Sequence, residues 1–300
     1  MYGIKRINRI YESAKRVSFD NNSKIVLMSD CHRGDGSWAD TFSKNQNSYL
    51  AALNYYYKQE FIYIELGDGD ELWENNEISE IINAHKDIFY ILSQFHKQKR
   101  LYFIYGNHDM AKKNRIYVKE NMFRYFDTRF KQYFPLFEDT QIYEGLVLSY
   151  VARKNGIFLI HGHQVDFFNC AMWRLSKFLV KFLWRPLEIF GVNDPTSTAK
   201  NYDKKKLVEE KLSSWVADKN LILIAGHTHR PVFPDLGMPR YFNAGSCVHP
   251  RCITAIEISC KEIMLVKWCV KTKDDGTLYI GREILAGPVR LSGYFSTADE

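Results

Sequence analysis

The residues with the clearest chemical potential follow five short apolar runs along the chain. The central run, residues 101–105, leads through Gly106 directly into Asn107, His108 and Asp109. The other four runs lead into the same types of side chain, namely Asp30 with His32, Asp68, His161, and His227 with His229. Imidazole nitrogens combined with carboxylate and amide oxygens suit divalent transition metals. We therefore expect the chain to build one metal centre from these side chains.

The local spacing of these residues supports this expectation. Asp30 and His32 lie two residues apart, so in an extended segment their side chains point to the same side and one metal could bind both. Gly67 and Gly69 flank Asp68, which allows a sharp turn and a close approach to a ligand. A single such motif is typical of an ordinary strand end. Five in series indicate a shared function.

The apolar runs predict the elements that position these side chains. A short apolar run that ends in a glycine or polar residue suits a buried strand, and open α/β sheets gather their chemistry at the carboxyl ends of strands. We expect strands that end near residues 29, 66, 105, 160 and 225. Further strands are expected near 146–151 and 240–246 and a β-meander over 252–285, and helices near 47–59, 77–97 and 199–218. Residues 1–20 have apolar residues at helical spacing, which favours a short surface helix over a membrane anchor.

The composition is that of a globular protein. The chain has 300 residues, of which 46% are hydrophobic, and we expect one domain over 1–300 with a helical insertion at about 164–217. The net charge of +6 favours anionic partners. The six cysteines form no Cys-x-x-Cys pair, so neither a zinc ribbon nor a redox motif is indicated, and reduced, cytoplasmic thiols are the simplest interpretation. No apolar run reaches the ~18 residues that a spanning helix needs.

Two segments allow alternative interpretations. In the expected helix 167–185, basic residues form one stripe on an otherwise apolar helix: Arg174, Lys177, Lys181 and Arg185. This helix is either a lid or membrane-facing element, or a core helix whose basic side chains reach the surface. Residues 112–137 interleave aromatic and basic side chains, which fits either nucleic-acid binding or an amphipathic cover over the sheet.

Taken together, the five motifs resemble the calcineurin-like metallophosphoesterase superfamily over about residues 24–246. The resemblance implies an α/β fold, a four-layer α/β/β/α sandwich, and a hydrolase with two metal ions. The first metal would be held by Asp30, His32, Asp68 and His229. The second would be held by Asp68, Asn107, His161 and His227, so that Asp68 bridges the two.

The charges of this ligand set agree with such an activity. Two divalent cations would carry four positive charges, whereas only Asp30 and Asp68 among the ligands are carboxylates. The remaining positive charge could bind a phosphoryl oxygen and lower the pKa of a bridging water, which would then attack as hydroxide. Mixed nitrogen and oxygen donors suit Mn²⁺, Fe or Zn²⁺, and we expect Mn²⁺ first.

Other residues near the motifs receive supporting roles. His108 would protonate the leaving oxygen or stabilise developing charge, and Asp109 would orient His108. Arg33 could bind a substrate phosphate through two hydrogen bonds, although a surface ion pair is an equal alternative. His163 could support a ligand, act as an extra ligand or be structural.

Within the superfamily, the chain looks like the bacterial UDP-2,3-diacylglucosamine hydrolases, which are peripheral membrane enzymes. The similarity lies in residues 226–231 and in the spacing of Gly67, Asp68 and Glu71. His108 stands where that family usually has arginine, and His163 where it has an acidic residue. The resemblance implies an amphiphilic phosphorylated substrate and membrane contact through 167–185. The alternatives are hydrolysis of a soluble phosphoprotein or nucleotide, and a non-catalytic scaffold, which the complete ligand set disfavours. We do not expect nucleic acid as a partner.

Overall fold

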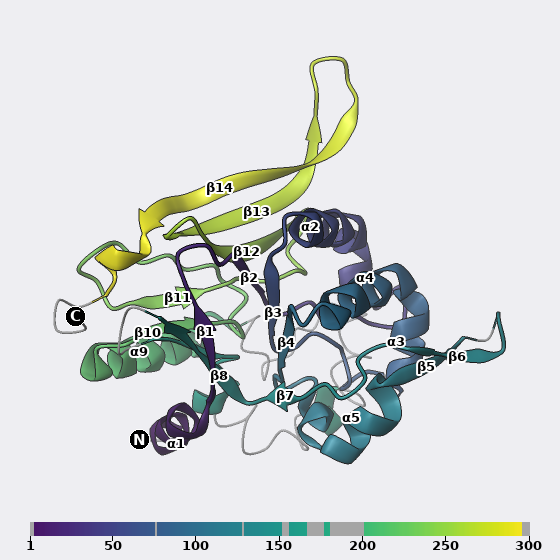
Figure 1. Ribbon diagram of the computed structural model, residues 1–300, viewed down its shortest axis with the longest axis horizontal. Helices are drawn as coiled ribbons and strands as arrows, with labels where there is room; N and C mark the ends of the chain where they lie inside the picture. Colours follow the sequence, from purple (N-terminus) through teal and green to yellow (C-terminus); the bar gives the residue numbers. More distant parts are fainter. Residues whose placement is uncertain are drawn as a thin grey trace.

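Two mixed β-sheets pack face to face, and helices cover the outer face of each sheet (Figure 1). This architecture is seen in a computed structural model that describes residues 3–75, 77–127, 129–151, 156–166, 177–180 and 201–295. The expected sandwich of two β-sheets between helices is therefore confirmed.

The larger sheet has seven strands in the order β14-β13-β12-β2-β3-β4-β7. Strands β2, β3, β4 and β7 run parallel, whereas β12, β13 and β14 form an antiparallel meander joined to β2. Their bounds are β2 (Ile25–Met28), β3 (Ile62–Leu66), β4 (Leu101–Ile104), β7 (Ile142–Tyr143), β12 (Cys252–Ser259), β13 (Glu262–Thr272) and β14 (Leu278–Arg290). The meander expected over 252–285 is confirmed, and its last strand continues to Arg290.

The smaller sheet has five strands in the order β1-β8-β9-β10-β11. All neighbouring pairs are parallel except β8 and β9. The bounds are β1 (Lys15–Phe19), β8 (Gly145–Tyr150), β9 (Gly156–Ile160), β10 (Ile222–Ala225) and β11 (Tyr241–Asn243). A separate hairpin consists of β5 (Arg124–Asp127) and β6 (Gln132–Pro135).

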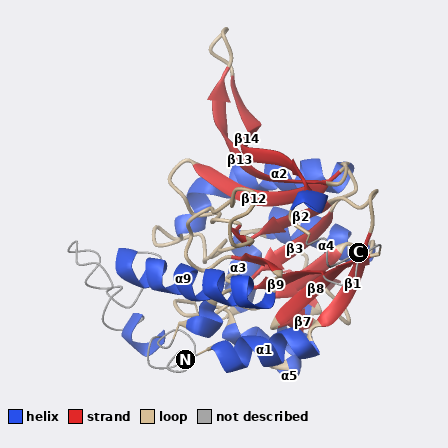
Figure 2. Cartoon of the chain, turned by 90° about the vertical axis from the view of Figure 1, so that its left-hand side faces the viewer, coloured by secondary structure: helices blue, strands red, loops and turns tan. Residues whose placement is uncertain are grey.

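Three buried clusters hold the four layers together. The central cluster lies between the sheets and uses alternate residues of their strands, such as Leu27, Ile64, Leu148 and Ile224. The second joins the larger sheet to α2 (Gln46–Lys58), α3 (Ile78–Ala84), α4 (Lys86–Lys97) and α5 (Arg115–Met122). The third joins the smaller sheet to α1 (Ile4–Ser13) and α9 (Tyr202–Lys219), which lie on one side of the molecule (Figure 2). Short 3-10 helices are η1 (Thr41–Asn45), η2 (Met110–Lys113), η3 (His163–Val165) and η5 (Leu291–Gly293).

Two expected helices differ from the structure. The N-terminal helix ends at Ser13, and residues 15–19 form β1 because Val17 and Phe19 alternate into the core between the sheets. The helix expected over 77–97 is divided at His85. The buried ring of His85 contacts Asp40 at 2.8 Å, and its backbone leaves the helical conformation at φ −119°.

The insertion expected at 164–217 is only partly described. Helix α9 begins at Tyr202, close to the predicted helix over 199–218. The predicted helix 167–185, with Arg174, Lys181 and Arg185, lies outside the described residues except for 177–180, which are helical. Among the residues that are described, no helix is long and apolar enough to cross a membrane.

Candidate metal centre

The predicted metal-binding residues all follow the carboxyl ends of strands. Asp30 and His32 follow β2, Asp68 follows β3, and Asn107 follows β4 in the larger sheet. His161 follows β9, and His227 and His229 follow β10 in the smaller sheet. Six of the seven are buried, and His229 is half-buried. The site therefore lies where the carboxyl ends of the strands of the two sheets meet.

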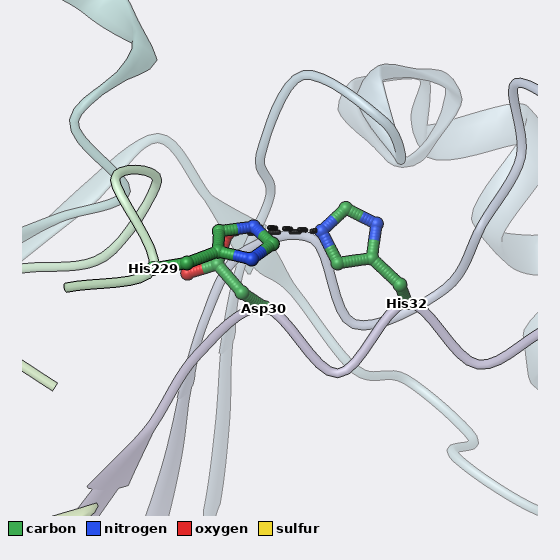
Figure 3. Close-up of side chains that lie close together, drawn as sticks. All are labelled: Asp30, His32 and His229. Carbon is green, nitrogen blue, oxygen red and sulfur yellow. Dashed lines mark hydrogen bonds and ion pairs between the residues drawn. The ribbon is translucent and has the colours of Figure 1, made fainter. Parts of the chain in front are cut away.

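Three side chains form a first group (Figure 3). The Nε2 atom of His229 lies 3.1 Å from Asp30 Oδ1 and 3.2 Å from His32 Nε2. The Nε2 atom of His32 lies 3.8 Å from Asp30 Oδ1. Ligands about 2.1 Å from one cation lie roughly 3–3.5 Å from each other, so this group has the spacing of a metal site.

A second group contains Asp68, His161 and His227, whose ligand atoms all lie within 4.8 Å of one another. Asp68 Oδ2 lies 3.1 Å from His161 Nε2 and also 3.9 Å from His32 Nε2 in the first group. Asp68 therefore stands between the two groups, as a bridging carboxylate would.

Three predicted ligand atoms are buried and make no hydrogen bond of good geometry. They are Asp30 Oδ1, Asn107 Oδ1 and His161 Nε2. A buried polar atom without a partner costs about 1–3 kcal/mol, and native proteins rarely leave several together. Divalent cations would satisfy all three atoms. The residues present therefore fit a centre that holds metal at both groups.

Two histidines are oriented through the nitrogen that faces away from the centre. The Nδ1 atom of His32 lies 2.8 Å from Glu71 Oε2, and Nδ1 of His161 lies 2.8 Å from the carbonyl oxygen of Leu66. Both partners are acceptors, so each Nδ1 donates a hydrogen bond, and Nε2 is the nitrogen that remains for the centre.

The carboxylates and His227 are oriented in the same way. The backbone N–H of His227 donates to Asp30 Oδ2 at 2.9 Å, and that of His108 donates to Asp68 Oδ1 at 2.8 Å. Each carboxylate thus keeps its other oxygen for the centre. His227 Nε2 lies 3.2 Å from Asp166 Oδ2, which leaves Nδ1 as its ligand atom.

The backbone at the centre is unusual. Five predicted ligands have left-handed backbone angles, with φ of 53° at Asp30, 47° at His32, 50° at Asp68, 69° at His227 and 55° at His229. Non-glycine residues rarely adopt this conformation, and such strain concentrates at functional sites. Gly67 has a φ of 95°, and a Cβ there would lie 2.7 Å from the His161 ring. A side chain at position 67 would displace that ligand.

The charges of the groups keep the carboxylates ionised. Burial alone would raise the pKa of Asp30, but His229 and His161 outweigh it and hold the pKa well below its usual value. Burial would lower the pKa of His161, but Asp68 and Asp30 raise it to about 9. The carboxylates are therefore ionised, and a divalent cation would displace the protons that the imidazoles hold without metal.

His108 lies beside the centre and is held by two residues. Its Nδ1 donates to Glu71 Oε1 at 2.8 Å, and its ring stacks on Trp73 with centroids 4.1 Å apart and planes 21° apart. The indole N–H of Trp73 donates to the carbonyl oxygen of Asn107 at 2.7 Å. The His108 side chain is 21% exposed, so a substrate could reach it.

The expectation that Asp109 orients His108 is wrong, because Glu71 has that position. Asp109 is fully buried, and its carboxylate accepts from the Gly106 N–H at 2.6 Å and from Lys112 at 2.7 Å. The spacing from Asp68 to Glu71 was a visible signal in the sequence. No pattern in the sequence indicated the position of Trp73 or the orienting role of Asp166.

The expectation that Arg33 binds a substrate phosphate is also wrong. Its guanidinium is fully buried and donates to Glu65 through two nitrogens at 2.7 and 2.9 Å and to Asp70 at 2.7 Å. Lys112 joins Asp70 to Asp109 through contacts of 2.7 Å each. This buried charge network fixes the turns after β2, β3 and β4, and Arg33 has no surface for a ligand.

His163 is enclosed behind the second group. It is fully buried, its ring centroid lies 5.5 Å from that of His161, and neither ring nitrogen has a hydrogen-bond partner. Burial, His161 and His227 lower its pKa well below the usual value. Among the described residues, a third group with metal-site spacing consists of His32, Glu71 and His108, and none of the three groups includes His163, which argues against an extra ligand.

A comparison with known families supports this geometry. The family model described as calcineurin-like phosphoesterase matches residues 23–231, which include all seven predicted metal ligands. No curated protein matches the sequence.

Two solved structures are similar in shape. Vps29 from Chaetomium thermophilum is 10% identical, with 88% of this chain and 96% of that chain covered and a TM-score of 0.36. A provisionally named 5'-nucleotidase from Staphylococcus aureus, in complex with alpha-ketoglutarate, is 12% identical, with 88% and 54% covered and a TM-score of 0.34. Neither similarity says anything about the reaction of this chain.

Proposed function

The chain belongs to the calcineurin-like phosphoesterase family, and we propose that it hydrolyses a phosphate ester or pyrophosphate at two metal ions that share Asp68. The observation that carries this proposal is the position of Asp68 Oδ2, which lies 3.1 Å from His161 Nε2 and 3.9 Å from His32 Nε2. Each nitrogen belongs to a different group of ligands.

Asp30, His32, Asp68 and His229 would hold one metal, and Asp68, Asn107, His161 and His227 the other. When bound, divalent cations would polarise a phosphoryl oxygen and lower the pKa of a water molecule. The donor set of nitrogen and oxygen without thiolate supports Mn²⁺, Fe or Zn²⁺, of which Mn²⁺ is proposed first.

His108 supplies the proton for the leaving oxygen. Since its Nδ1 donates to Glu71, its Nε2 is the atom that can meet the substrate. Burial lowers the pKa of His108, but Glu71 and Asp68 outweigh it and raise the pKa above its usual value, which keeps a proton available. The stacked indole of Trp73 prevents the ring from turning away.

For the substrate, we favour an amphiphilic phosphorylated molecule similar to UDP-diacylglucosamine. Support comes from residues 226–231 and from the contact between Lys177 and the site. Lys177 Nζ donates to the carbonyl oxygen of Leu72 at 2.5 Å, directly beside Glu71 and Trp73. The family model covers the superfamily as a whole and gives no specific support for this substrate. The second candidate is a soluble phosphoester such as a nucleotide or phosphoprotein.

The test of the reaction compares leaving groups. His108→Ala should reduce turnover of an alkyl phosphodiester by ~10²–10⁴-fold, because its poor leaving group needs a proton. The loss should be much smaller for a nitrophenyl ester, and metal content should not change. The control is His96→Ala. His96 lies on α4, and its Nε2 donates to the carbonyl oxygen of Glu138. Equal losses on both esters would contradict the assigned role.

The test of the substrate compares three compounds under one condition. With Mn²⁺ present, kcat/KM should be highest for a UDP-diacylglucosamine-like pyrophosphate in detergent and lower for a nucleotide and a phosphopeptide. A preference for a soluble compound would favour the second candidate. A chelator should abolish turnover of all three, and re-addition of Mn²⁺, Fe²⁺ or Zn²⁺ should identify the metal.

A further inference from the structure

The hairpin of β5 and β6 projects from the body beside α3 and α5 (Figure 1). Its register pairs Tyr125 with Phe134 and Phe126 with Tyr133. Because side chains alternate along a strand, Tyr125 and Phe134 share one face, and Phe126 and Tyr133 share the other.

The two faces have different surroundings. On the inner face, the rings of Tyr125 and Phe134 stack with centroids 5.7 Å apart, and Tyr125 packs against the core. On the outer face, Phe126 is 43% exposed and Tyr133 is 60% exposed, with ring centroids 5.2 Å apart. The outer face of a hairpin packed on one side is normally polar, so exposed aromatic rings need a reason.

The end of the hairpin adds a third exposed ring. Phe130, between the strands, is 60% exposed, and its ring forms a T-shaped contact with Phe134, with centroids 6.0 Å apart. Large apolar side chains that gather on a projecting surface mark an interaction site. Phe126, Phe130 and Tyr133 are hereafter called the aromatic tip.

Basic residues border the aromatic tip. Arg124, Arg129 and Lys131 are all exposed. The one acidic side chain of the hairpin, Asp127, is buried and accepts from Lys86 at 3.0 Å. The surface of the hairpin is therefore positive and apolar, which complements an anionic surface with an apolar interior.

Arginines lie over two of the three rings of the aromatic tip, which disfavours the stacking of bases there. The guanidinium of Arg124 lies 4.6 Å from the Tyr133 ring centroid, and that of Arg129 lies 5.4 Å from the Phe130 ring centroid. A single-stranded nucleic acid would need open ring faces for its bases. In a bilayer the ring edges can enter the apolar layer while the arginines meet headgroup phosphates, so the geometry fits lipid better.

We propose that the β5–β6 hairpin docks on an anionic lipid surface. The aromatic tip enters the interface between headgroups and acyl chains, and Arg124, Arg129 and Lys131 bind lipid phosphates. The proposal uses no residue of the metal centre and does not rest on the proposed function.

Sedimentation with vesicles tests this proposal. The wild-type chain should bind vesicles of phosphatidylcholine with phosphatidylglycerol and bind phosphatidylcholine alone weakly. The triple variant Phe126→Ser, Phe130→Ser and Tyr133→Ser should bind at least about tenfold more weakly. The triple variant Arg124→Gln, Arg129→Gln and Lys131→Gln should show a similar loss at low salt and a smaller one at high salt.

The hairpin of β13 and β14 provides a matched control. Leu278 and Tyr279 of β14 are 66% and 42% exposed, and Leu278→Ser with Tyr279→Ser should leave vesicle binding unchanged. All variants should keep the wild-type circular dichroism and turnover of a soluble nitrophenyl ester. Unchanged binding in both hairpin variants, an equal loss in the control, or wild-type binding to an oligonucleotide but not to vesicles would overturn the proposal.

Discussion

Asp68 and His161 come from different sheets, yet Asp68 Oδ2 lies 3.1 Å from His161 Nε2. Asp68 follows β3 of the larger sheet, and His161 follows β9 of the smaller one. Both strands contribute to the apolar core between the sheets, so sheet packing sets this distance. The metal centre is therefore a product of the whole sandwich, and no single loop contains it.

Glu71→Gln should damage metal binding and catalysis together. Glu71 accepts hydrogen bonds from Nδ1 of His32 and Nδ1 of His108, and an amide offers one acceptor oxygen in place of two. We expect about 10–100-fold weaker binding of one metal, as for other residues that orient ligands, and lower turnover. Metal titration and ester hydrolysis would check this. The control is Glu77→Gln, at the exposed start of α3. Wild-type metal affinity in Glu71→Gln would refute the orienting role of Glu71.

Asp166→Asn should weaken the other metal selectively. Asp166 Oδ2 lies 3.2 Å from Nε2 of His227, which is a ligand of the second group. We expect about a 10–100-fold loss of affinity for one of two metals. Calorimetric titration should resolve one weakened and one unchanged binding event. Two equally weakened events would indicate a general structural effect.

Arg33→Met should destabilise the fold without a direct effect on substrate binding. The substitution leaves Glu65 and Asp70 buried without their cation, which typically costs ~3–5 kcal/mol in the free energy of unfolding. Arg33→Lys should cost less but remain destabilising, since an ammonium cannot form the two-nitrogen contact with Glu65. Urea denaturation measures these changes in the free energy of unfolding. A raised KM in a variant with wild-type stability would instead indicate that Arg33 binds the substrate.

The sequence was a good guide to the strands that end at the site. Each has an apolar run followed at once by a ligand type, as in Ile25–Met28 before Asp30 and Ile222–Ala225 before His227. These are local patterns that one stretch of sequence contains in full. Strand β1 was missed because its pairing with β8, more than a hundred residues away, is not visible in residues 15–19.

The errors at the site have a similar cause. Arg33 is adjacent to His32 in sequence, but it pairs with Asp70 in a short β-bridge and its side chain points into the interior. Asp109 is adjacent to His108, but its carboxylate accepts hydrogen bonds from Gly106 and Lys112. A residue adjacent in sequence to a site residue lies near the site, but its side chain can point away from it. The direction of the side chain depends on which buried partner it contacts.

Metal content tests the central claim most directly, namely that two metal ions share Asp68. Wild-type protein loaded with Mn²⁺ and freed of excess metal should contain two ions per chain by elemental analysis. Asp68→Asn should lose metal from both groups, whereas His229→Ala should lose mainly one ion, because His229 contacts Asp30 and His32 and belongs to the first group. One ion per wild-type chain, or two ions retained in Asp68→Asn, would contradict the account.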